Sequence, residues 1–326
     1  MGEFELLAML RERLADPGPR VRIGMGDDAA VTVPGGATAT SVDAIVDGVH
    51  FRRQTAPLPS IGRKALAAGL SDLAAMGAEA GEAYVVLGVP PDLDEDGCLE
   101  VFEGIEELAA ETGTSLAGGD VTRAPALAIA ITVVGHADEA ECFVTRGGAA
   151  EGDTVVLTGE LGGAAAGLRL LSEPELADGL DAAAAAGLRA RQLDPRPRLA
   201  EGRALALAGA GAMIDLSDGL GADAGHVAAR SGLGLEVDMT AVPLQDGVAE
   251  VAEAAGLDPL EVAAGGGEDY ELLACISGEG LKPARESMAA LGCPLTVIGR
   301  CVAGEGALLS GPESREIQAR GFDQLT

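Results

Sequence analysis

The chain has 326 residues, and its 52 acidic against 22 basic side chains give a formal net charge of −30. A surface this acidic repels nucleic acid and anionic membranes, and an aromatic content of 2% leaves few stacking platforms for single strands. The five cysteines lack disulfide or zinc spacing and no apolar run is long enough to span a membrane, so we expect a cytoplasmic protein that binds neither nucleic acid nor membranes.

Hydrophobic periodicity predicts a mixture of helices and strands, beginning with an amphipathic helix at 3–15. The further helices are predicted at 60–77, 94–112, 162–171, 181–191, 197–209 and 218–231. The strands are predicted at 38–43, 83–89, 114–117, 126–135, 154–159, 213–217, 234–238, 270–276, 294–299 and 306–309. Because strands and helices do not alternate as a doubly wound sheet requires, the pattern favours an α+β fold.

A chain of this length leaves room for two domains, each with a core of its own. The segment 136–153, "HADEAECFVTRGGAAEGD", is polar and contains glycine, which is typical of a joint between domains. We therefore predict an N-terminal α+β domain at 1–137 and a C-terminal α+β domain at 138–326.

The stretch "RIGMGDDAAV" at 22–31 resembles a phosphate-binding loop but carries two adjacent carboxylates, Asp27 and Asp28. Its central part fits the G-x-G-x-x-A form of the dinucleotide fingerprint, in which the backbone approaches a pyrophosphate. Carboxylates at these positions would repel the phosphates. The chain also lacks a Walker A lysine, so the phosphate charge has to be neutralised in another way.

Further carboxylates lie in short segments of low complexity, several of them predicted as turns after a strand or before a helix. These segments are "SVDAIVDGVHF" (Asp43, Asp47, His50), "LSDLAAMG" (Asp72), "AGGDVTR" (Asp120), "IDLSDGL" (Asp215, Asp218) and "GGGEDYEL" (Glu268, Asp269). Any one acid can be explained as a helix cap or a turn residue. Glycine directly before several of them permits close approach of a ligand, which favours a shared binding role.

Asp72 lies in the apolar middle of "ALAAGLSDLAAMGA", a segment of strongly helical composition. A carboxylate buried there without a partner would be costly, and a divalent cation would supply that partner. Hard oxygen ligands without Cys or His pairs favour Mg²⁺ over zinc. Magnesium that bridges carboxylates to phosphate oxygens would replace the missing lysine, which explains how a phosphate site can be acidic.

The chain resembles the thiamine-monophosphate kinase family, whose superfamily includes aminoimidazole ribonucleotide synthetase and selenophosphate synthetase. The motifs that carry the resemblance are "GMGDDAAV", "DAIVDGVHF", "LSDLAAMGA", "GGDVTR", "TRGGAAEGD", "VVLTGELGGAAAGL", "IDLSDGL" and "GGGEDYEL". The resemblance covers essentially the whole chain. It implies ATP-dependent phosphorylation of thiamine monophosphate by direct in-line transfer, without a covalent catalytic residue. It also implies a homodimer formed through the N-terminal sheet, and a C-terminal α+β sandwich.

The same resemblance implies roles for individual residues. The implied Mg²⁺ ligands are Asp28, Asp43, Asp72, Asp120, Asp215 and Asp218, helped by Asp27 and Ser41. The implied ATP contacts are Gly119, Asp120, Arg146 and Ser217. The implied thiamine contacts are His50, Glu268 and Phe322. Val42 departs from the pattern, because the family often has threonine beside the metal-binding Asp43.

Two other functions stay open on the sequence alone. One is another ATP-using synthetase of the superfamily, such as aminoimidazole ribonucleotide synthetase, although "GGGEDYEL" and "DGVHF" match the thiamine enzyme better. The other is a non-catalytic nucleotide or metal sensor, which would bind nucleotide without forming a product.

Overall fold

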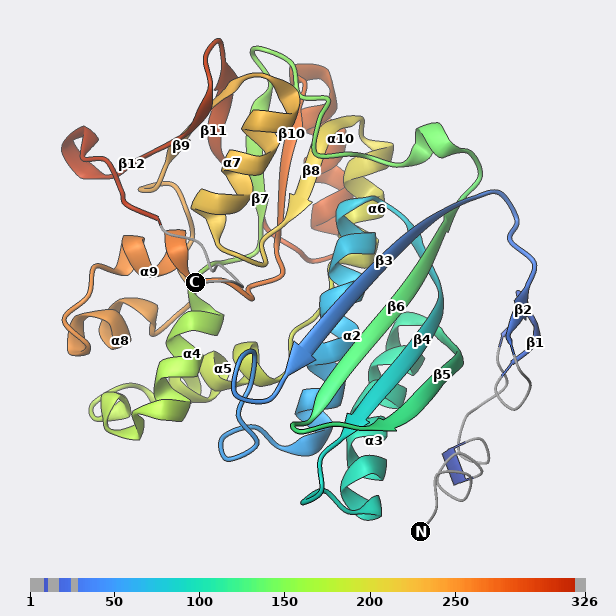
Figure 1. The fold of residues 1–326 in the computed structure, drawn as a ribbon. Helices are drawn as coiled ribbons and strands as arrows, with labels where there is room; N and C mark the ends of the chain where they lie inside the picture. Colours follow the sequence, from blue (N-terminus) through green and yellow to red (C-terminus); the bar gives the residue numbers. More distant parts are fainter. Residues whose placement is uncertain (1–8, 11–17, 25–28, 320–326) are drawn as a thin grey trace. The chain divides into compact units, whose positions relative to one another are not determined.

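The computed structural model describes residues 9–10, 18–24 and 29–319 (Figure 1). The chain divides into two compact units, the first made of 1–73 and 78–142 and the second of 74–77 and 143–326. Both units combine helices with a mixed sheet, so the prediction of two α+β domains is confirmed. The predicted helix at 3–15 falls mostly outside the described residues.

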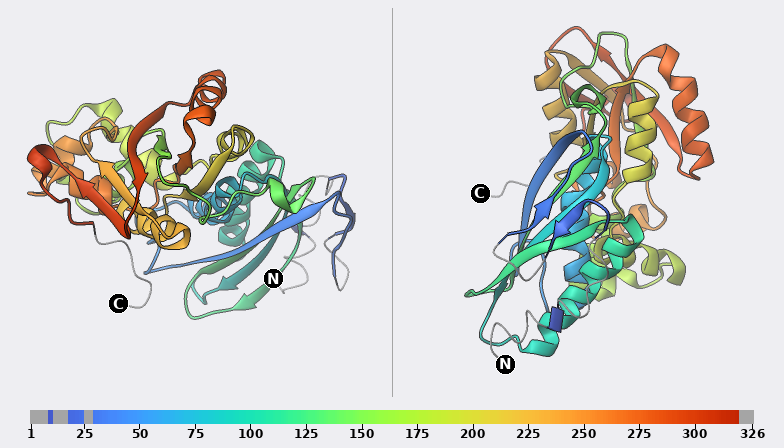
Figure 2. Two further views of the ribbon diagram at one scale, coloured as in Figure 1. Left: turned by 90° about the horizontal axis from the view of Figure 1, so that it is seen from above. Right: turned by 90° about the vertical axis from the view of Figure 1, so that its right-hand side faces the viewer.

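The first unit is a four-stranded sheet with two helices packed on one face (Figure 2). Its strands are β3 (Ala37–Val46), β4 (Glu79–Val89), β5 (Ser115–Arg123) and β6 (Ala128–Ala137). The spatial order is β3-β6-β4-β5, in which only β4 and β5 run parallel. The helices α2 (Leu58–Ala75) and α3 (Glu95–Thr112) cover what we call the covered face. A small ribbon of β1 (Val21–Ile23) and β2 (Val31–Thr32) and the short helix η1 (Ala140–Cys142) complete the unit.

Glycine allows α2 and α3 to pack closely on the covered face. A Cβ at Gly62 would lie 1.9 Å from the Val101 carbonyl oxygen, and one at Gly104 would lie 1.7 Å from the Pro59 carbonyl oxygen. Any side chain at these positions would force the helices apart. The covered face therefore forms a tightly packed core whose geometry is set by backbone contact.

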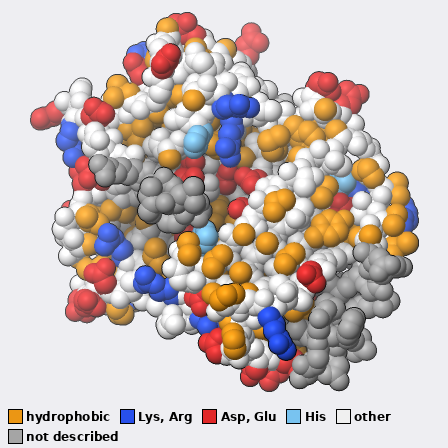
Figure 3. Space-filling view, viewed as in Figure 1, with side chains coloured by type: hydrophobic (Ala, Val, Ile, Leu, Met, Phe, Trp, Pro, Cys, Tyr) orange, Lys and Arg blue, Asp and Glu red, His pale blue; other side chains and the backbone are white. Residues whose placement is uncertain are grey.

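The opposite face of this sheet, the open face, carries exposed apolar side chains. Val42 on β3 is 68% exposed and Val86 on β4 is 42% exposed. Figure 3 shows hydrophobic side chains spread over the area where the sheet lies in Figure 1. Between the two valines, β6 contributes the small or β-branched residues Ala130 and Thr132. Such a contiguous apolar surface is typical of an interface.

The second unit is built on a six-stranded sheet. Its strands are β7 (Thr154–Thr158), β8 (Ala210–Asp215), β9 (Gly234–Asp238), β10 (Leu272–Ile276), β11 (Leu295–Val302) and β12 (Gly306–Ser310), in the order β12-β9-β11-β7-β10-β8. Its helices are α4 (Gly163–Ser172), α5 (Ala182–Leu193), α6 (Leu199–Leu207), α7 (Leu220–Ser231), α8 (Val248–Ala254), α9 (Pro259–Gly265) and α10 (Gly278–Ala290), with short helices η2 (Pro174–Ala177) and η3 (Pro312–Ser314).

Each face of this sheet has its own apolar core, because successive strand residues point to opposite sides. Val155 and Leu157 of β7 pack with α7 and α9, whereas Val156 between them packs with α6 and α10. A third cluster joins α4, α5 and α8. Helices on both faces of a mixed sheet form the α+β sandwich expected for this half of the chain.

Most predicted elements are present within a few residues, and three differences affect the site. The strand predicted at 114–117 extends through Arg123 as β5, because it pairs along its length with β4. The strand predicted from residue 270 begins at Leu272. Three helices, α8, α9 and α10, lie where no element is predicted. Among the described residues, no helix combines the length and the apolar character that crossing a bilayer would need.

Candidate functional site

In the first unit, three predicted metal ligands lie on the covered face of the sheet. Ser41 and Asp43 are two residues apart on β3 and therefore point to the same side. The Ser41 hydroxyl donates a hydrogen bond to Oδ2 of Asp72, which lies on α2. All three side chains are half-buried. The covered face thus brings together a set of hydroxyl and carboxylate oxygens.

Asp120 does not join this group within the chain. The sequence predicts a turn there, and this prediction is wrong, because Asp120 lies inside β5, at the opposite edge of the sheet from β3. Asp120 pairs with the exposed Val86 and so faces the open side. Three strand spacings also put roughly 14 Å between the two edge strands. Its neighbour Gly119 is needed for close pairing, because a Cβ there would lie 2.0 Å from the Val85 carbonyl oxygen.

His50 lies in the turn that follows β3. Its Nδ1 accepts a hydrogen bond from the Val46 amide at 3.1 Å, so the neutral ring carries its proton on Nε2. The buried Lys64 on α2 donates to the His50 carbonyl oxygen at 3.4 Å. Arg53 closes the turn through a 2.8 Å ion pair with Asp47. The turn therefore holds the imidazole in one tautomer, as a hydrogen-bond donor through Nε2.

In the second unit, two predicted site segments, 215–219 and 266–271, hold each other through their backbones. Three hydrogen bonds of 2.8 to 3.0 Å join them, from Leu216 to Glu271, from Glu268 to Ser217 and from Tyr270 to Leu216. The approach requires glycine, since a Cβ at Gly267 would lie 2.3 Å from the Ser217 carbonyl oxygen. The two motifs are therefore held together. One carries the implied ATP and metal residues, and the other carries an implied thiamine residue.

The segment 266–271 carries backbone strain. Glu268 has a φ of 67° and Tyr270 a φ of 50°, both in the left-handed region that non-glycine residues rarely adopt. A regular strand cannot pass through such residues, which explains why β10 begins only at Leu272. Strain of this kind persists where the surroundings enforce it and concentrates at functional sites.

Asp215 and Asp218 lie around a third acid, Asp223, that the sequence analysis missed. Asp215 ends β8 and is buried, and Asp218 is half-buried. Oδ2 of Asp223 accepts hydrogen bonds from the amides of Asp218 and Gly219, both at 3.1 Å. Burial, and then the charges of Asp215 and Asp218, raise the pKa of Asp223 to about 8. An acid in the first turn of α7 that reaches back to two amides is a capping arrangement that the sequence could have suggested.

The strained segment is anchored by a buried ion-pair network, also missed. Glu271 is fully buried and accepts hydrogen bonds from Arg198 at 2.6 and 2.8 Å. Arg191, on α5, donates to the same carboxylate. A carboxylate that is buried requires such cationic partners. The sequence could have indicated this network, because Glu271 comes directly before an apolar strand and is therefore expected to be buried.

Asp269 binds the start of α4. Its carboxylate accepts from the amides of Gly162 at 2.7 Å and Ala164 at 3.1 Å. Burial raises the pKa of Asp269 to about 6, although Arg191 and the two amides favour the charged form. This acid, which the sequence analysis included among the candidate carboxylates, therefore tethers a helix to the strained segment.

The remaining predicted residues are exposed or outside the described part. Arg146 is exposed, and its carbonyl oxygen accepts a hydrogen bond from the Ser231 hydroxyl at 3.3 Å. Asp27, Asp28 and Phe322 lie outside the described residues. Within the ranges that the structure describes, no group of three or more His, Cys, Asp or Glu side chains is arranged to hold a metal ion.

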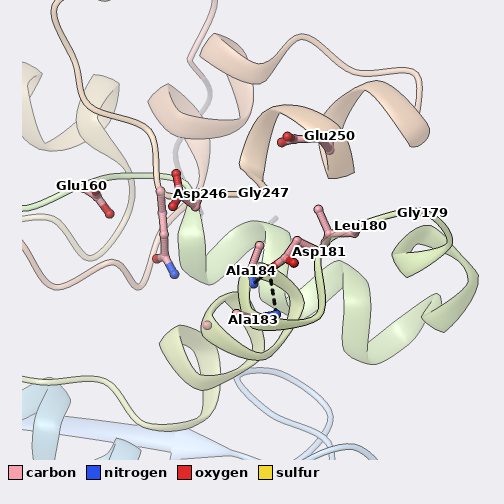
Figure 4. A pocket seen from close by; sticks show the side chains of 11 residues that line it. Glu160, Gly179, Leu180, Asp181, Ala183, Ala184, Asp246, Gly247 and Glu250 are labelled. Carbon is pink, nitrogen blue, oxygen red and sulfur yellow. Dashed lines mark hydrogen bonds between the residues drawn. The ribbon is translucent and has the colours of Figure 1, made fainter.

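A separate pocket of about 580 Å³ lies in the second unit, beside α5 and α8 (Figure 4). It is lined by the carboxylates of Glu160, Asp181, Asp246 and Glu250. Asp181 accepts hydrogen bonds from the first amides of α5, so its charge serves as a helix cap. None of the predicted site residues lines this pocket.

Family models match both halves of the chain. AIR synthase related protein, N-terminal domain, matches residues 26–137, and AIR synthase related protein, C-terminal domain, matches residues 150–309. The chain is 36% identical to a thiamine-monophosphate kinase of Mycobacterium tuberculosis over 280 residues, which cover 85% of this chain and 81% of the relative.

Solved structures agree with the sequence relatives. A thiamine-monophosphate kinase from Stenotrophomonas maltophilia K279a superposes with a TM-score of 0.82 at 34% identity and covers 96% of each chain. A structure described as AaThiL complexed with AMPPCP and TMP superposes with a TM-score of 0.78 at 28% identity, over 99% of this chain and 97% of the other. With its two AIR synthase related domains and this degree of identity, the chain belongs to the thiamine-monophosphate kinase family.

Proposed function

We propose that this chain catalyses the ATP-dependent phosphorylation of thiamine monophosphate to thiamine diphosphate. The observation that carries this proposal is the interlocking of segments 215–219 and 266–271, which joins an implied nucleotide motif to an implied thiamine motif. The relative that binds AMPPCP and TMP supports the same pair of substrates. The activity follows from family membership together with this geometry.

The acids of both units suit Mg²⁺. Every donor in the sets Ser41–Asp43–Asp72 and Asp215–Asp218 is an oxygen, the ligand type that Mg²⁺ prefers. The charges of Asp215 and Asp218 help to raise the pKa of the neighbouring Asp223, which indicates an excess of negative charge that a divalent cation would relieve. When bound, Mg²⁺ would neutralise the negative charge on the phosphate oxygens. The implied ligands Asp27 and Asp28 belong to the same proposal.

The chain's own side chains bind and orient the substrates. His50 offers an Nε2 proton to an acceptor on thiamine monophosphate, since its Nδ1 already accepts from the backbone. Glu268 and Phe322 contact the thiamine part, and Arg146, Gly119 and Ser217 contact ATP. The acceptor phosphate is ionised near neutral pH, so the transfer needs neither a general base nor a covalent nucleophile.

The proposal includes a dimer formed through the open face of the N-terminal sheet. The open face of the N-terminal sheet exposes Val42 and Val86, and burying them would favour a symmetric dimer. Asp120 faces that side, at the edge remote from Asp43 and Asp72. In the dimer that we propose, Asp120 of one copy serves the site whose other ligands belong to its partner. The cytoplasmic location expected from the sequence stays a prediction.

The direct test is an assay of the purified protein with thiamine monophosphate, ATP and Mg²⁺, in which thiamine diphosphate is measured by chromatography. We expect thiamine diphosphate and ADP in equal amounts. Binding of nucleotide without formation of thiamine diphosphate would favour the alternative of a non-catalytic nucleotide or metal sensor. Turnover of ATP without formation of thiamine diphosphate would favour another ATP-using synthetase of the superfamily.

A further inference from the structure

Gln192, near the end of α5, points its amide at a predicted substrate residue. The side chain is 5% exposed, and its Nε2 donates a 2.8 Å hydrogen bond to Oε2 of Glu268. Its position is restricted by close packing with α4, because a Cβ at Gly167 would lie 3.2 Å from the Gln192 Cβ. A long polar side chain loses rotamer freedom when it is buried, so an ordered amide at this place needs a compensating contact.

The main chain of Glu268 is also held in place, by the 215–219 segment. Its amide donates to the Ser217 carbonyl oxygen at 2.9 Å, and its backbone is held in the left-handed conformation. With the backbone fixed, the side-chain torsions decide where the carboxylate points. The Gln192 amide restricts these torsions by holding one carboxylate oxygen.

The chemistry of this partner differs from that of the neighbouring acid. Three residues along, Glu271 is held by the cations Arg191 and Arg198, which neutralise its charge. Gln192 is neutral, so it orients Glu268 without adding a positive charge to it. A carboxylate that is oriented by an amide keeps its attraction for a cationic ring, and thiamine monophosphate contains a thiazolium ring.

We propose that Gln192 is a positioning residue that orients the Glu268 carboxylate toward the thiamine part of the substrate. This inference rests on the proposed function and extends it to a residue outside the motifs quoted above for the family resemblance. Gln192 acts only through Glu268, and it has no role at the phosphates. Its removal therefore affects recognition of thiamine monophosphate and leaves recognition of ATP intact.

The test compares Gln192→Met, which keeps the side-chain length but removes the donor, with wild type in the thiamine diphosphate assay. We expect KM for thiamine monophosphate to rise about tenfold or more, since a hydrogen bond to a charged group is lost. We expect KM for ATP to stay within about twofold. Gln245→Met is the matched control, because Gln245 is another glutamine packed beside α4, at Gly163, and it lines the separate pocket beside α5 and α8. The control variant should keep both KM values.

A double-mutant cycle separates positioning from a general loss of packing. In a Glu268→Gln background, Gln192→Met should leave KM for thiamine monophosphate unchanged, because the residue through which it acts has already been altered. An equal rise in both KM values, an unchanged KM for thiamine monophosphate in the single variant, or additive effects in the double variant would overturn the proposal. Failure of the proposed function is seen separately, as wild-type protein that forms no thiamine diphosphate.

Discussion

The two units present their predicted ligands in different ways. In the first unit Ser41 and Asp43 lie on β3 and Asp72 on α2, so regular elements set their directions. In the second unit Asp218 and Glu268 lie on two irregular segments that hold each other by backbone hydrogen bonds. Regular elements orient side chains through their periodicity, whereas irregular segments need tertiary partners to do so. Substitutions in the two units should therefore have different effects.

The largest expected effects come from removing one ligand in each unit. We expect Asp72→Asn and Asp218→Asn each to lower kcat by about 10²-fold or more, since under the proposed function each would remove part of the charge that binds the phosphates through Mg²⁺. Steady-state assays over a range of Mg²⁺ concentrations measure this. Asp96→Asn is the control, because Asp96 is exposed in the first turn of α3. If either variant keeps nearly wild-type activity at saturating Mg²⁺, the substituted acid is not a ligand that the reaction needs.

The position of Asp120 permits a sharper test within the first unit. If Asp120 serves the partner's site, a mixture of Asp72→Asn and Asp120→Asn chains contains dimers with one intact site. After equal mixing and exchange we expect about a quarter of the wild-type activity from two inactive parents. Co-expression of differently tagged chains followed by the chromatographic assay measures it. No recovery, with mixed dimers isolated, would show that Asp120 acts within its own chain or outside the site.

The buried Asp269 predicts a pH dependence of stability in the second unit. Its folded pKa is about 6 against an ordinary value of 3.8, so the native state keeps a proton that the unfolded state releases. The contribution of this group to the free energy of unfolding therefore falls as pH rises from about 4 to 6, by up to roughly 3 kcal/mol. Asp269→Asn should remove this dependence. Urea unfolding of both proteins between pH 4 and 8 measures it, and parallel pH profiles would contradict the assignment.

The smallest expected effect is at an exposed ion pair of the second unit. Arg300 on β11 and Glu236 on β9 approach to 2.7 Å, with side chains 69% and 45% exposed. Because solvent screens such pairs, Glu236→Gln should lower the free energy of unfolding by less than about 1 kcal/mol. Urea unfolding at low and high salt measures the change. A larger loss would mean that the pair between β9 and β11 stabilises the fold more than its exposure indicates.

The sequence by itself determined the α+β class, most elements and the motifs that group the chain with its family. These features depend on local patterns, because hydrophobic periodicity and glycine-acid spacing act over a few residues. The side on which Asp43 lies also follows from strand alternation once β3 is identified. Helices as short as α8 and α9, with seven residues each, carry too little periodicity to be recognised.

Only the tertiary structure decided where Asp120 points, where β10 begins and which residues support Glu268. Asp120 faces the open side because β5 pairs with β4, a contact between segments distant in the sequence. Glu268 and Tyr270 adopt left-handed conformations because their amides bond to the 215–219 loop. Gln192 and Asp223 become significant only through the groups that they contact. These features arise from long-range hydrogen bonds and burial, which no local pattern encodes.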